Sequence, residues 1–384
     1  MTASIHNESL LAGQPAATAD DPTAGLAAEL RATASRFFAA ALDEPNARTL
    51  GPADTYRTLR PGLADLGWFG LPADDSLGAV GAPRLTTPMF SLAGSALVPG
   101  PLLEDVVIGP ALRAMLPPER ADELTERTPF AFVDCAKAGR PPLPAPPVPS
   151  LVNGLLTGTA GPLAHVGEVE WLLVSAESPA GGQLLLLASD HPGIKVTPVA
   201  SLDPCSTMAI VSFRCQIGEA EVLSSGEEAD NILIRLRALA RLALSSELHG
   251  ISAHLADISV SYALQRYQFG RPIGSFQAVK HMLAAMACDV IALGNLVQTV
   301  ADRFPADQES AAIWCAVAKS HASKVAVKTA AMALQVHGGI GFTEEHPLQY
   351  YYKRALALES RLGLPAELDA LVGAARVARM PLRR

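Results

Sequence analysis

The stretch "RYQFGRPIGSFQAVKH", from Arg266 to His281, places Arg, Gln, Phe and Gly together within a strongly helical third of the chain. Apolar residues recur at helical spacing on both sides of it, over 231–265 and 276–304. Glycine and proline interrupt helices, so the stretch predicts a sharp connection between two long helices. A plain connection explains the glycines and the proline, whereas the accompanying Arg, Gln and Phe indicate a further role.

A third helical segment runs over 311–337, so three long helices follow one another in this part of the chain. Helices of about 25 to 35 residues exceed the usual globular length and are typical of antiparallel bundles. We therefore predict that residues 227–384 form a C-terminal helical bundle.

The preceding part of the chain changes character twice. Residues 1–27 are rich in Ala, Thr, Asp, Asn and Pro without periodicity, which indicates a loose N-terminal arm. Residues 28–128 have helical periodicity broken by Pro and Gly, and predict a helical domain. Residues 129–226 contain short apolar segments separated by Gly, Pro, Asp and Ser, and predict a small β domain. The predicted fold class is therefore α+β and mainly helical.

Composition narrows the class of protein. The 384 residues, 49% hydrophobic and 18% charged, suffice for two or three domains. The net charge of -8, without a block of Lys and Arg, argues against a nucleic-acid partner. The apolar runs are shorter than the roughly 20 residues that cross a bilayer, and the N-terminus lacks a signal-peptide pattern, so we expect no membrane insertion and a cytoplasmic location. Five scattered cysteines predict free thiols and no metal site.

A second stretch, "QVHGGIGFTEEHPLQYYYKRA" from Gln335 to Ala355, joins a glycine-rich turn to a segment rich in tyrosine and arginine. Weaker matches, "LGWFGLPADD" and "ALVPGPLLED", lie at 66–75 and 96–105. With the Arg266–His281 turn and the order of the regions, they resemble the acyl-CoA dehydrogenase family of flavoproteins over most of the chain after residue 55. The resemblance implies an N-terminal helical domain, a small middle β-barrel or sandwich domain and a C-terminal four-helix bundle.

The resemblance assigns FAD to the two turns, and the residue types suit that cofactor. A planar guanidinium such as that of Arg266 can bind a pyrophosphate through paired, charge-assisted hydrogen bonds. Amide side chains donate to phosphate or ribose, phenyl rings offer apolar faces, and glycines let backbone amides approach a phosphate. The predicted cofactor-binding residues are Arg266, Gln268, Phe269, Phe276, Gln277, Gln335, Gly338 and Gly339.

In the family, these two segments reach the cofactor across a subunit interface. This implies a homodimer, a homotetramer or a heterotetramer with a related chain. The expected reaction is FAD-dependent α,β-dehydrogenation of an acyl thioester, either acyl-CoA or acyl-ACP, the ester of an acyl carrier protein. The expected electron acceptor is an electron-transfer flavoprotein or a similar protein.

The reaction implied by the resemblance needs a carboxylate that removes the α proton. Many members carry this Glu directly before a Gly that follows the tyrosine-rich segment, but here Leu362 precedes Gly363. Glu359 would lie about 60° away on a helix, and we interpret it as solvated or salt-bridged. The usual base is therefore absent from its usual position.

The family has a second location for the base, on the helix that leads into the Arg266 turn. Glu247 lies there on an apolar stripe, where a carboxylate is costly to bury unless it is protonated, paired or used. We therefore predict Glu247 as the catalytic base that takes the α proton while the β hydride passes to flavin N5. The alternative is a structural Glu247 paired with a buried Arg or His.

The β region departs from the family pattern, because its Glu-Pro-x-Ala-Gly-Ser-Asp-like loop and Trp-Ile-Thr strand are not recognisable at 132–144 and 153–176. A second hypothesis follows: a non-catalytic or half-site subunit of a heteromeric acyl-CoA dehydrogenase that binds acyl thioester or completes a partner's FAD site. A third keeps the flavin but oxidises or oxygenates another substrate. We interpret His249, His281 and His337 as structural hydrogen-bonding residues.

Overall fold

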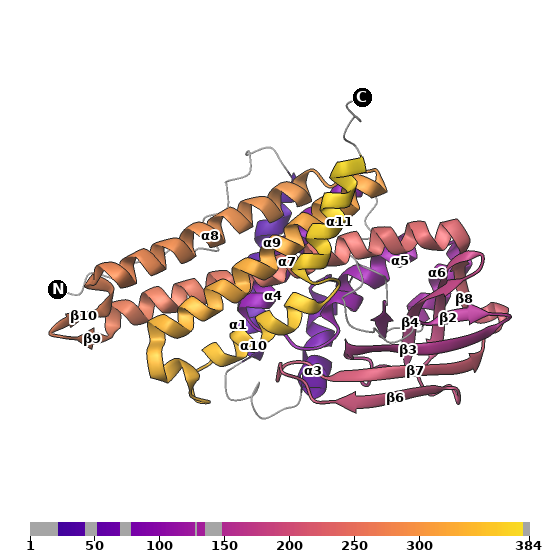
Figure 1. Cartoon of the computed structure of the whole chain (residues 1–384), viewed down its shortest axis with the longest axis horizontal. Helices are drawn as coiled ribbons and strands as arrows, with labels where there is room; N and C mark the ends of the chain where they lie inside the picture. Colours follow the sequence, from indigo (N-terminus) through magenta and orange to yellow (C-terminus); the bar gives the residue numbers. More distant parts are fainter. Residues whose placement is uncertain (1–21, 43–51, 70–77, 127–128, 135–147, 379–384) are drawn as a thin grey trace.

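Helix α7 (Gly226–Gln265) runs along the molecule from the sheet at one end to a small hairpin at the other (Figure 1). Its 40 residues form a helix about 60 Å long. The sequence predicted this helix from residue 231 onward. The structure is a computed structural model that describes residues 22–42, 52–69, 78–126, 129–134 and 148–378.

The middle of α7 is surrounded by protein, since every residue from 240 to 253 is buried. A helix that is covered on all sides forms the core of a larger assembly of helices. Buried serines of this segment donate their hydroxyl hydrogen bonds to backbone carbonyls one turn earlier in the helix. Ser245 Oγ, for example, donates to the Arg241 carbonyl at 2.6 Å. The helix ends because Arg266 adopts an extended conformation.

The N-terminal region is helical and packs on α7, mainly through α4 (Gly78–Ser95), which crosses α7 near Glu247 and Gly250. Helix α1 begins at Pro22, five residues before the predicted end of the arm, because proline suits the first turn of a helix. The rest of the predicted arm, 1–21, lies outside the described residues. The elements of this region are α1 (Pro22–Ala41), α3 (Pro52–Asp65), α4 (Gly78–Ser95), the π-helical turn η3 (Glu104–Ile108), α5 (Gly109–Met115) and α6 (Pro118–Glu126).

The middle region forms one eight-stranded sheet, in the order β6-β7-β3-β2-β4-β5-β8, with β1 parallel to β4. One face holds its own apolar cluster, with Leu156, Val174 and Phe213, while Leu173 and Leu184 on the other face join the helical core. The sheet therefore packs directly against helices. Its strands are β1 (Phe130–Val133), β2 (Ser150–Val152), β3 (Leu155–Ala164), β4 (Trp171–Ser178), β5 (Gly181–Ala188), β6 (Ile194–Val199), β7 (Met208–Gln216) and β8 (Val222–Ser225).

The C-terminal region is a bundle in which α7, α8 and α9 pack on one another and α10 packs on α7 and α9. Asp307 begins α9 by accepting a hydrogen bond from the Ser310 amide, and Gly338 ends it with a φ of 62°. The mainly helical α+β fold class is confirmed. The elements are α8 (Gln277–Asp302), α9 (Gln308–His337), η6 (Gly338–Phe342), α10 (Leu348–Ser360), α11 (Pro365–Ala378) and the hairpin of β9 (Tyr267–Gln268) and β10 (Arg271–Pro272).

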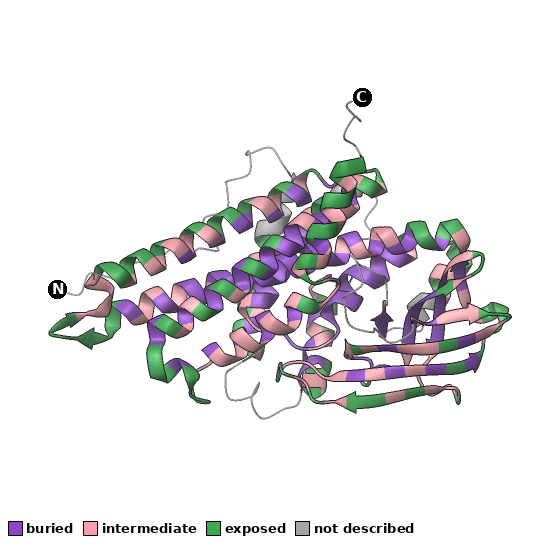
Figure 2. Cartoon of the chain, in the orientation of Figure 1, coloured by how far each residue is buried: buried purple, intermediate pink, exposed green. Residues whose placement is uncertain are grey.

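Helix α8 is the one described helix that is long and apolar enough to cross a membrane by length and composition. Core helices of globular bundles meet the same criteria, and α8 packs along α7 and α9. Figure 2 shows that burial is greatest along α7 and least at the hairpin tip.

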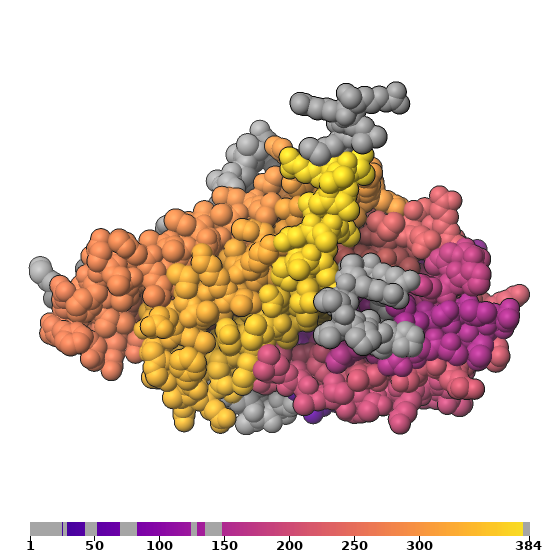
Figure 3. Space-filling model, in the orientation of Figure 1, coloured from indigo at the N-terminus to yellow at the C-terminus, as the bar shows by residue number. Residues whose placement is uncertain are grey.

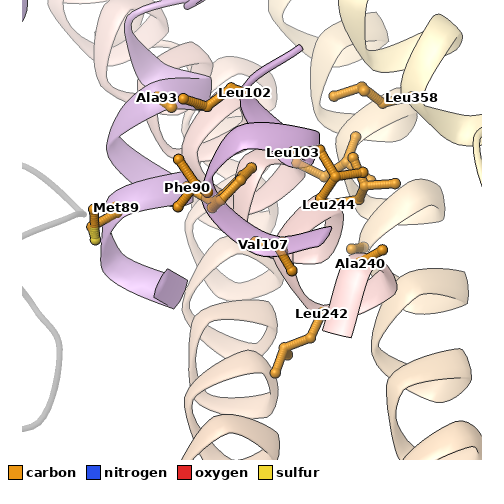
Figure 4. Packing of buried hydrophobic residues seen from close by; sticks show 14 of the residues in the cluster. Met89, Phe90, Ala93, Leu102, Leu103, Val107, Ala240, Leu242, Leu244 and Leu358 are labelled. Carbon is orange, nitrogen blue, oxygen red and sulfur yellow. The ribbon is translucent and has the colours of Figure 1, made fainter. Parts of the chain in front are cut away.

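Helices α4 and α7 approach closely enough to require glycine at both contact points. A Cβ on Gly250 would overlap the Ser91 carbonyl, and one on Gly94 would overlap the Glu247 carbonyl. Met89, Phe90 and Ala93 of α4 belong to the apolar core around this crossing (Figure 4). This packing fixes the position of the α7 segment that carries Glu247.

Candidate active site

Glu247 is buried near the middle of α7, with 7% of its surface exposed. Its Oε1 accepts a hydrogen bond from Nη1 of Arg354 at 2.8 Å. The sequence left open that Glu247 pairs with a buried arginine, and the structure contains this pair. Because Glu247 also lines a cavity, the pairing does not remove it from the candidate site.

Arg354 of α10 is the central cation of this site. Its Nε donates to Asp203, its Nη1 donates to the Val98 carbonyl at 3.2 Å, and its Nη2 donates to the Cys205 carbonyl at 3.2 Å. Burial opposes its charge, but Asp203 and Glu247 together raise the pKa of Arg354 above its ordinary value. Arg354 therefore stays charged and joins α10, α7 and the loop before β7.

The cavity lies between the sheet and the helices and has a volume of about 650 Å³. Its walls come from β3, the loop before β7, α7, the segment before η3 and the end of α10. Figure 3 shows α11, in yellow, crossing this face of the molecule near the sheet. A volume of this size is typical of small-molecule and cofactor sites. None of the eight predicted cofactor-binding residues lines it.

Two further ion pairs involve residues of the cavity wall, Glu104 with Arg361 and Asp134 with Arg237, and neither pair was predicted from the sequence. Arg361 Nη2 donates to Oε1 of the buried Glu104 at 2.7 Å. Arg237 donates to both carboxylate oxygens of Asp134 at 2.8 Å. Each pair joins residues more than 100 positions apart in the chain. No local pattern could have indicated these partners.

Leu362 and Glu359 lie at the end of α10, near the position at which many family members carry the base. Leu362 occupies the position that holds the base in many family members, with a φ of 59°, and its carbonyl accepts a hydrogen bond from Nε of Arg241 at 3.0 Å. Glu359 does not line the cavity. Its carbonyl accepts a hydrogen bond from Nζ of the buried Lys319 at 3.2 Å. Of Glu247 and Glu359, only Glu247, the predicted base, lines the cavity.

The sheet side of the cavity carries a polar cluster that the sequence did not indicate. His165 is buried, with a φ of 62°, and its Nδ1 lies 3.4 Å from Oε2 of Glu168. Ser206 Oγ lies 3.5 Å from Nε2 of the same ring. His165 directly follows β3, Ser206 lies in the loop before β7, and both line the cavity.

The hairpin after α7 is exposed. Phe269 has 91% of its surface exposed, and Arg266 and Gln268 are also exposed. Within the described chain, no side-chain hydrogen bond or ion pair holds Arg266, Gln268 or Gln335. Phe276 is partly covered by the Arg271 guanidinium, 4.1 Å from its ring centroid, and Gln277 lies 3.2 Å from the His281 ring nitrogen.

The glycine-rich turn lies at the same end of the molecule as the hairpin (Figure 1). The rings of Tyr262, at the end of α7, and His337, at the end of α9, stack with centroids 4.5 Å apart. Gly338 and Gly339 have open space where a Cβ would lie, so their backbone is accessible. The fold therefore brings the two predicted cofactor-binding segments together at the tip.

The tip and the cavity are far apart within one chain. Arg266 follows Glu247 by nineteen residues of helix, which corresponds to about 28 Å. The hairpin and the glycine-rich turn therefore do not contribute to the cavity of their own chain.

The three histidines singled out from the sequence all have hydrogen-bonding partners. His249 Nδ1 lies 3.0 Å from Ser91 Oγ, and His337 Nδ1 lies 2.8 Å from the Ala333 carbonyl. His281 contacts Gln277. The described cysteines, at 205, 215, 288 and 315, are free thiols.

Comparison with known proteins agrees with this architecture. The family model described as acyl-CoA dehydrogenase, C-terminal domain, matches residues 234–363. Acyl-CoA dehydrogenase FadE34 of Mycobacterium tuberculosis is 32% identical over 321 residues, which cover 82% of this chain and 41% of FadE34. Acyl-CoA dehydrogenase IpdE2 of the same organism is 33% identical over 202 residues, which cover 53% of this chain and 56% of IpdE2.

Solved structures share the whole arrangement. A chain of the ChsE4–ChsE5 complex from Mycobacterium tuberculosis superposes with a TM-score of 0.78 at 25% identity, covering 92% of this chain and 98% of that chain. The fold and the matched bundle are those of a class of flavoprotein oxidoreductases. The chain belongs to the acyl-CoA dehydrogenase family. It spans 41% of the length of FadE34 and 56% of that of IpdE2.

Proposed function

We propose that this chain is a subunit of an FAD-dependent dehydrogenase that forms an α,β double bond in an acyl thioester. Glu247 would take the α proton. The observation that carries the proposal is a buried carboxylate, that of Glu247, in the wall of a cavity between sheet and bundle. A thioester bound with its α carbon beside Glu247 would meet a base shielded from bulk water.

The partners of Glu247 leave it able to accept a proton. Arg354 engages Oε1, and no hydrogen bond holds Oε2 within the part of the chain that the structure describes. Arg354 also binds Asp203, so two carboxylates share one guanidinium. Oε2 of Glu247 is therefore the atom that would take the α proton of a bound thioester.

FAD, when bound, would accept the β hydrogen as a hydride at flavin N5. The residues at the tip suit its dinucleotide part, since a free guanidinium, free amides and an accessible glycine backbone all bind phosphate and ribose. In an oligomer, Arg266, Gln268, Phe269, Phe276, Gln277, Gln335, Gly338 and Gly339 of one chain would hold the cofactor of a neighbouring chain. The separation of about 28 Å along α7 supports the assignment of the cavity and the tip of one chain to two different cofactor sites.

The thioester carrier and the electron acceptor are proposed by class. CoA and acyl carrier protein present the same pantetheine arm, so the substrate is an acyl-CoA or an acyl-ACP. The acceptor would be an electron-transfer flavoprotein or a similar protein. The assembly would be a homodimer, a homotetramer or a heterotetramer with a related chain.

A reductive half-reaction tests the proposal. The purified holoprotein would be mixed anaerobically with acyl-CoA thioesters of increasing chain length while the flavin absorbance is followed. Bleaching of the flavin, with formation of enoyl-CoA in equal amount, is the expected result. A flavin-containing protein that is bleached by none of the thioesters would contradict it.

A half-site subunit is the second candidate. It is favoured by the distance between this chain's cavity and its own tip, and by the two-chain composition of the related ChsE4–ChsE5 complex. On this hypothesis the chain is colourless when produced alone and becomes yellow when produced with a related partner chain. Absorbance and size-exclusion mass of both preparations separate the two candidates. Oxygen consumption without thioester would indicate oxidation of another substrate.

A further inference from the structure

Arg241 is a buried arginine in the cavity wall that neither the base nor the cofactor proposal uses. It lies on α7 with 5% of its surface exposed. Its Nε donates to the Leu362 carbonyl at 3.0 Å, and the described residues give its side chain no other hydrogen bond. The two Nη atoms therefore remain available to a molecule in the cavity.

No carboxylate lies within salt-bridge distance of Arg241 among the described residues. Arg237, one turn earlier on α7, is by contrast paired with Asp134 through two hydrogen bonds. The segment that follows Asp134, residues 135–147, contains neither Asp nor Glu in its sequence. Among the described residues, Arg241 is thus a buried cation without a paired anion, and Asp134 and Glu367 act on its charge only from beyond salt-bridge distance. Such an arrangement is costly unless a ligand supplies the charge.

A second cation increases the positive potential at this place. Lys319 of α9 is fully buried, and its Nζ donates to Ser323 Oγ at 2.9 Å. Burial and then the charge of Arg241 lower the pKa of Lys319 to about 7. The negative charges of Glu359 and Glu247 act to raise the pKa of Lys319, but they do not cancel this lowering. An anion placed on Arg241 would relieve the excess positive charge.

We propose that Arg241 binds a carboxylate at the far end of the acyl group, so that this cavity accepts thioesters of dicarboxylic acids. The inference rests on the proposed function, because it assigns the acyl group to the cavity. Arg241 and Glu247 are six residues apart on one helix, or about 9 Å along its axis. The carboxylate would therefore lie several carbons beyond the α carbon.

The chemistry of Arg241 suits any compact anion with two oxygens, which includes a phosphate of the cofactor. We favour the acyl carboxylate because Arg241 shares the cavity wall and the helix of the predicted base. The cofactor-binding residues lie instead at the distant tip. The experiment below separates the two sources of the anion.

Binding of matched thioesters tests the inference without requiring turnover. Adipyl-CoA and hexanoyl-CoA have equal carbon numbers and differ in the terminal carboxylate. Their affinities for the holoprotein would be measured by calorimetry in a Glu247→Gln background, alone and combined with Arg241→Gln or Arg241→Lys. Arg235→Gln is the matched control, because Arg235 lies on the same helix but does not line this cavity.

Arg241→Gln is expected to weaken adipyl-CoA binding by about 10- to 100-fold, since a hydrogen-bonded charge is lost. Hexanoyl-CoA binding should change by less than about threefold, and Arg241→Lys should retain part of the preference for adipyl-CoA. Equal weakening of both thioesters would make Arg241 a structural residue and overturn the inference. Loss of bound FAD with unchanged thioester affinities would assign Arg241 to the cofactor instead.

The parent protein separates this inference from the proposed function. If its flavin is bleached by none of the thioesters in the reductive half-reaction, the proposed function fails. If it binds hexanoyl-CoA and Arg241→Gln leaves adipyl-CoA affinity unchanged, only the role of Arg241 fails.

Discussion

The cavity around Glu247 and the tip around Arg266 differ in how far their polar groups find partners within one chain. In the cavity wall, Glu247, Asp203 and Arg354 hold one another by buried hydrogen bonds. At the tip, Arg266 and Phe269 are exposed. Groups that are satisfied internally keep a site in shape, whereas unsatisfied ones of this kind mark a surface that another molecule completes. This difference agrees with the proposed function, in which the cavity carries the chemistry and the tip binds the cofactor or a partner.

Glu247→Gln tests the cavity half of this comparison and should have the largest effect. The amide keeps the size of the side chain and can still accept from Arg354, but it cannot take the α proton. The rate of flavin reduction by an acyl thioester should fall by about 10³- to 10⁴-fold, measured by anaerobic stopped-flow absorbance. Circular dichroism and FAD content should be unchanged. Glu359→Gln, outside the cavity, is the control, and an unchanged reduction rate in Glu247→Gln would exclude it as the base.

Gly250→Ala tests whether the cavity depends on the close crossing of α4 and α7. The new methyl group would overlap the Ser91 carbonyl, so the helices must separate. The free energy of unfolding should fall by about 3 kcal/mol, measured by urea denaturation. Gly373→Ala in α11, where the space is open, should instead stabilise by about 0.5 kcal/mol. Equal effects at the two positions would show that the crossing is tolerant.

Arg266→Gln tests the tip half of the comparison. Losing a charge-assisted pair to the pyrophosphate should weaken FAD binding by about 10- to 100-fold, measured by equilibrium dialysis. The thermal stability of the apoprotein should not change, since the side chain is exposed. Arg303→Gln, an exposed arginine at the other end of α8, should leave FAD affinity unaltered. Wild-type FAD affinity in Arg266→Gln would remove the tip from the cofactor site.

The pH dependence of stability probes the packing beside Glu247 and should be the smallest effect. Burial lowers the pKa of His249 to about 4, below the value of about 6.5 in an unfolded chain. Between these values the unfolded state binds more protons, so stability falls as the pH decreases. His249 should contribute a loss of about 2 kcal/mol between pH 7 and pH 5. Urea titrations of His249→Gln should lack this contribution, and an identical pH slope in both proteins would contradict it.

Much of the fold was accessible from periodicity. The long helices ending at Gln265 and His337 were predicted because a helix repeats its buried face every 3.6 residues, which is a local property. The stripe that carries Glu247 was visible for the same reason, and Leu244 and Ile251 on either side of it are buried. The start of α1 was missed because alanine, threonine and proline near residue 22 show no apolar period.

The side-chain contacts within the site could not be predicted from periodicity. The 107 positions between Arg354 and Glu247 carry no signal that the two side chains meet. The Tyr- and Arg-rich segment that contains Arg354 was recognised only through its family resemblance, which gave no role to Arg354. Asp203 stood in a segment without any recognised pattern, and the 96–105 match that contains Glu104 did not indicate that this carboxylate is buried.

The sequence by itself determined the helical and sheet regions, the two cofactor-like turns and the presence of a carboxylate on an apolar helix face, because these are local features. Only the tertiary structure decided that Arg354 binds both Asp203 and Glu247, and that Arg241 has no paired anion among the residues that the structure describes. It also decided that the two turns meet at the tip, about 28 Å along α7 from the cavity of their own chain. Those facts depend on how distant segments pack, and the charge balance of a buried site depends on every element that encloses it.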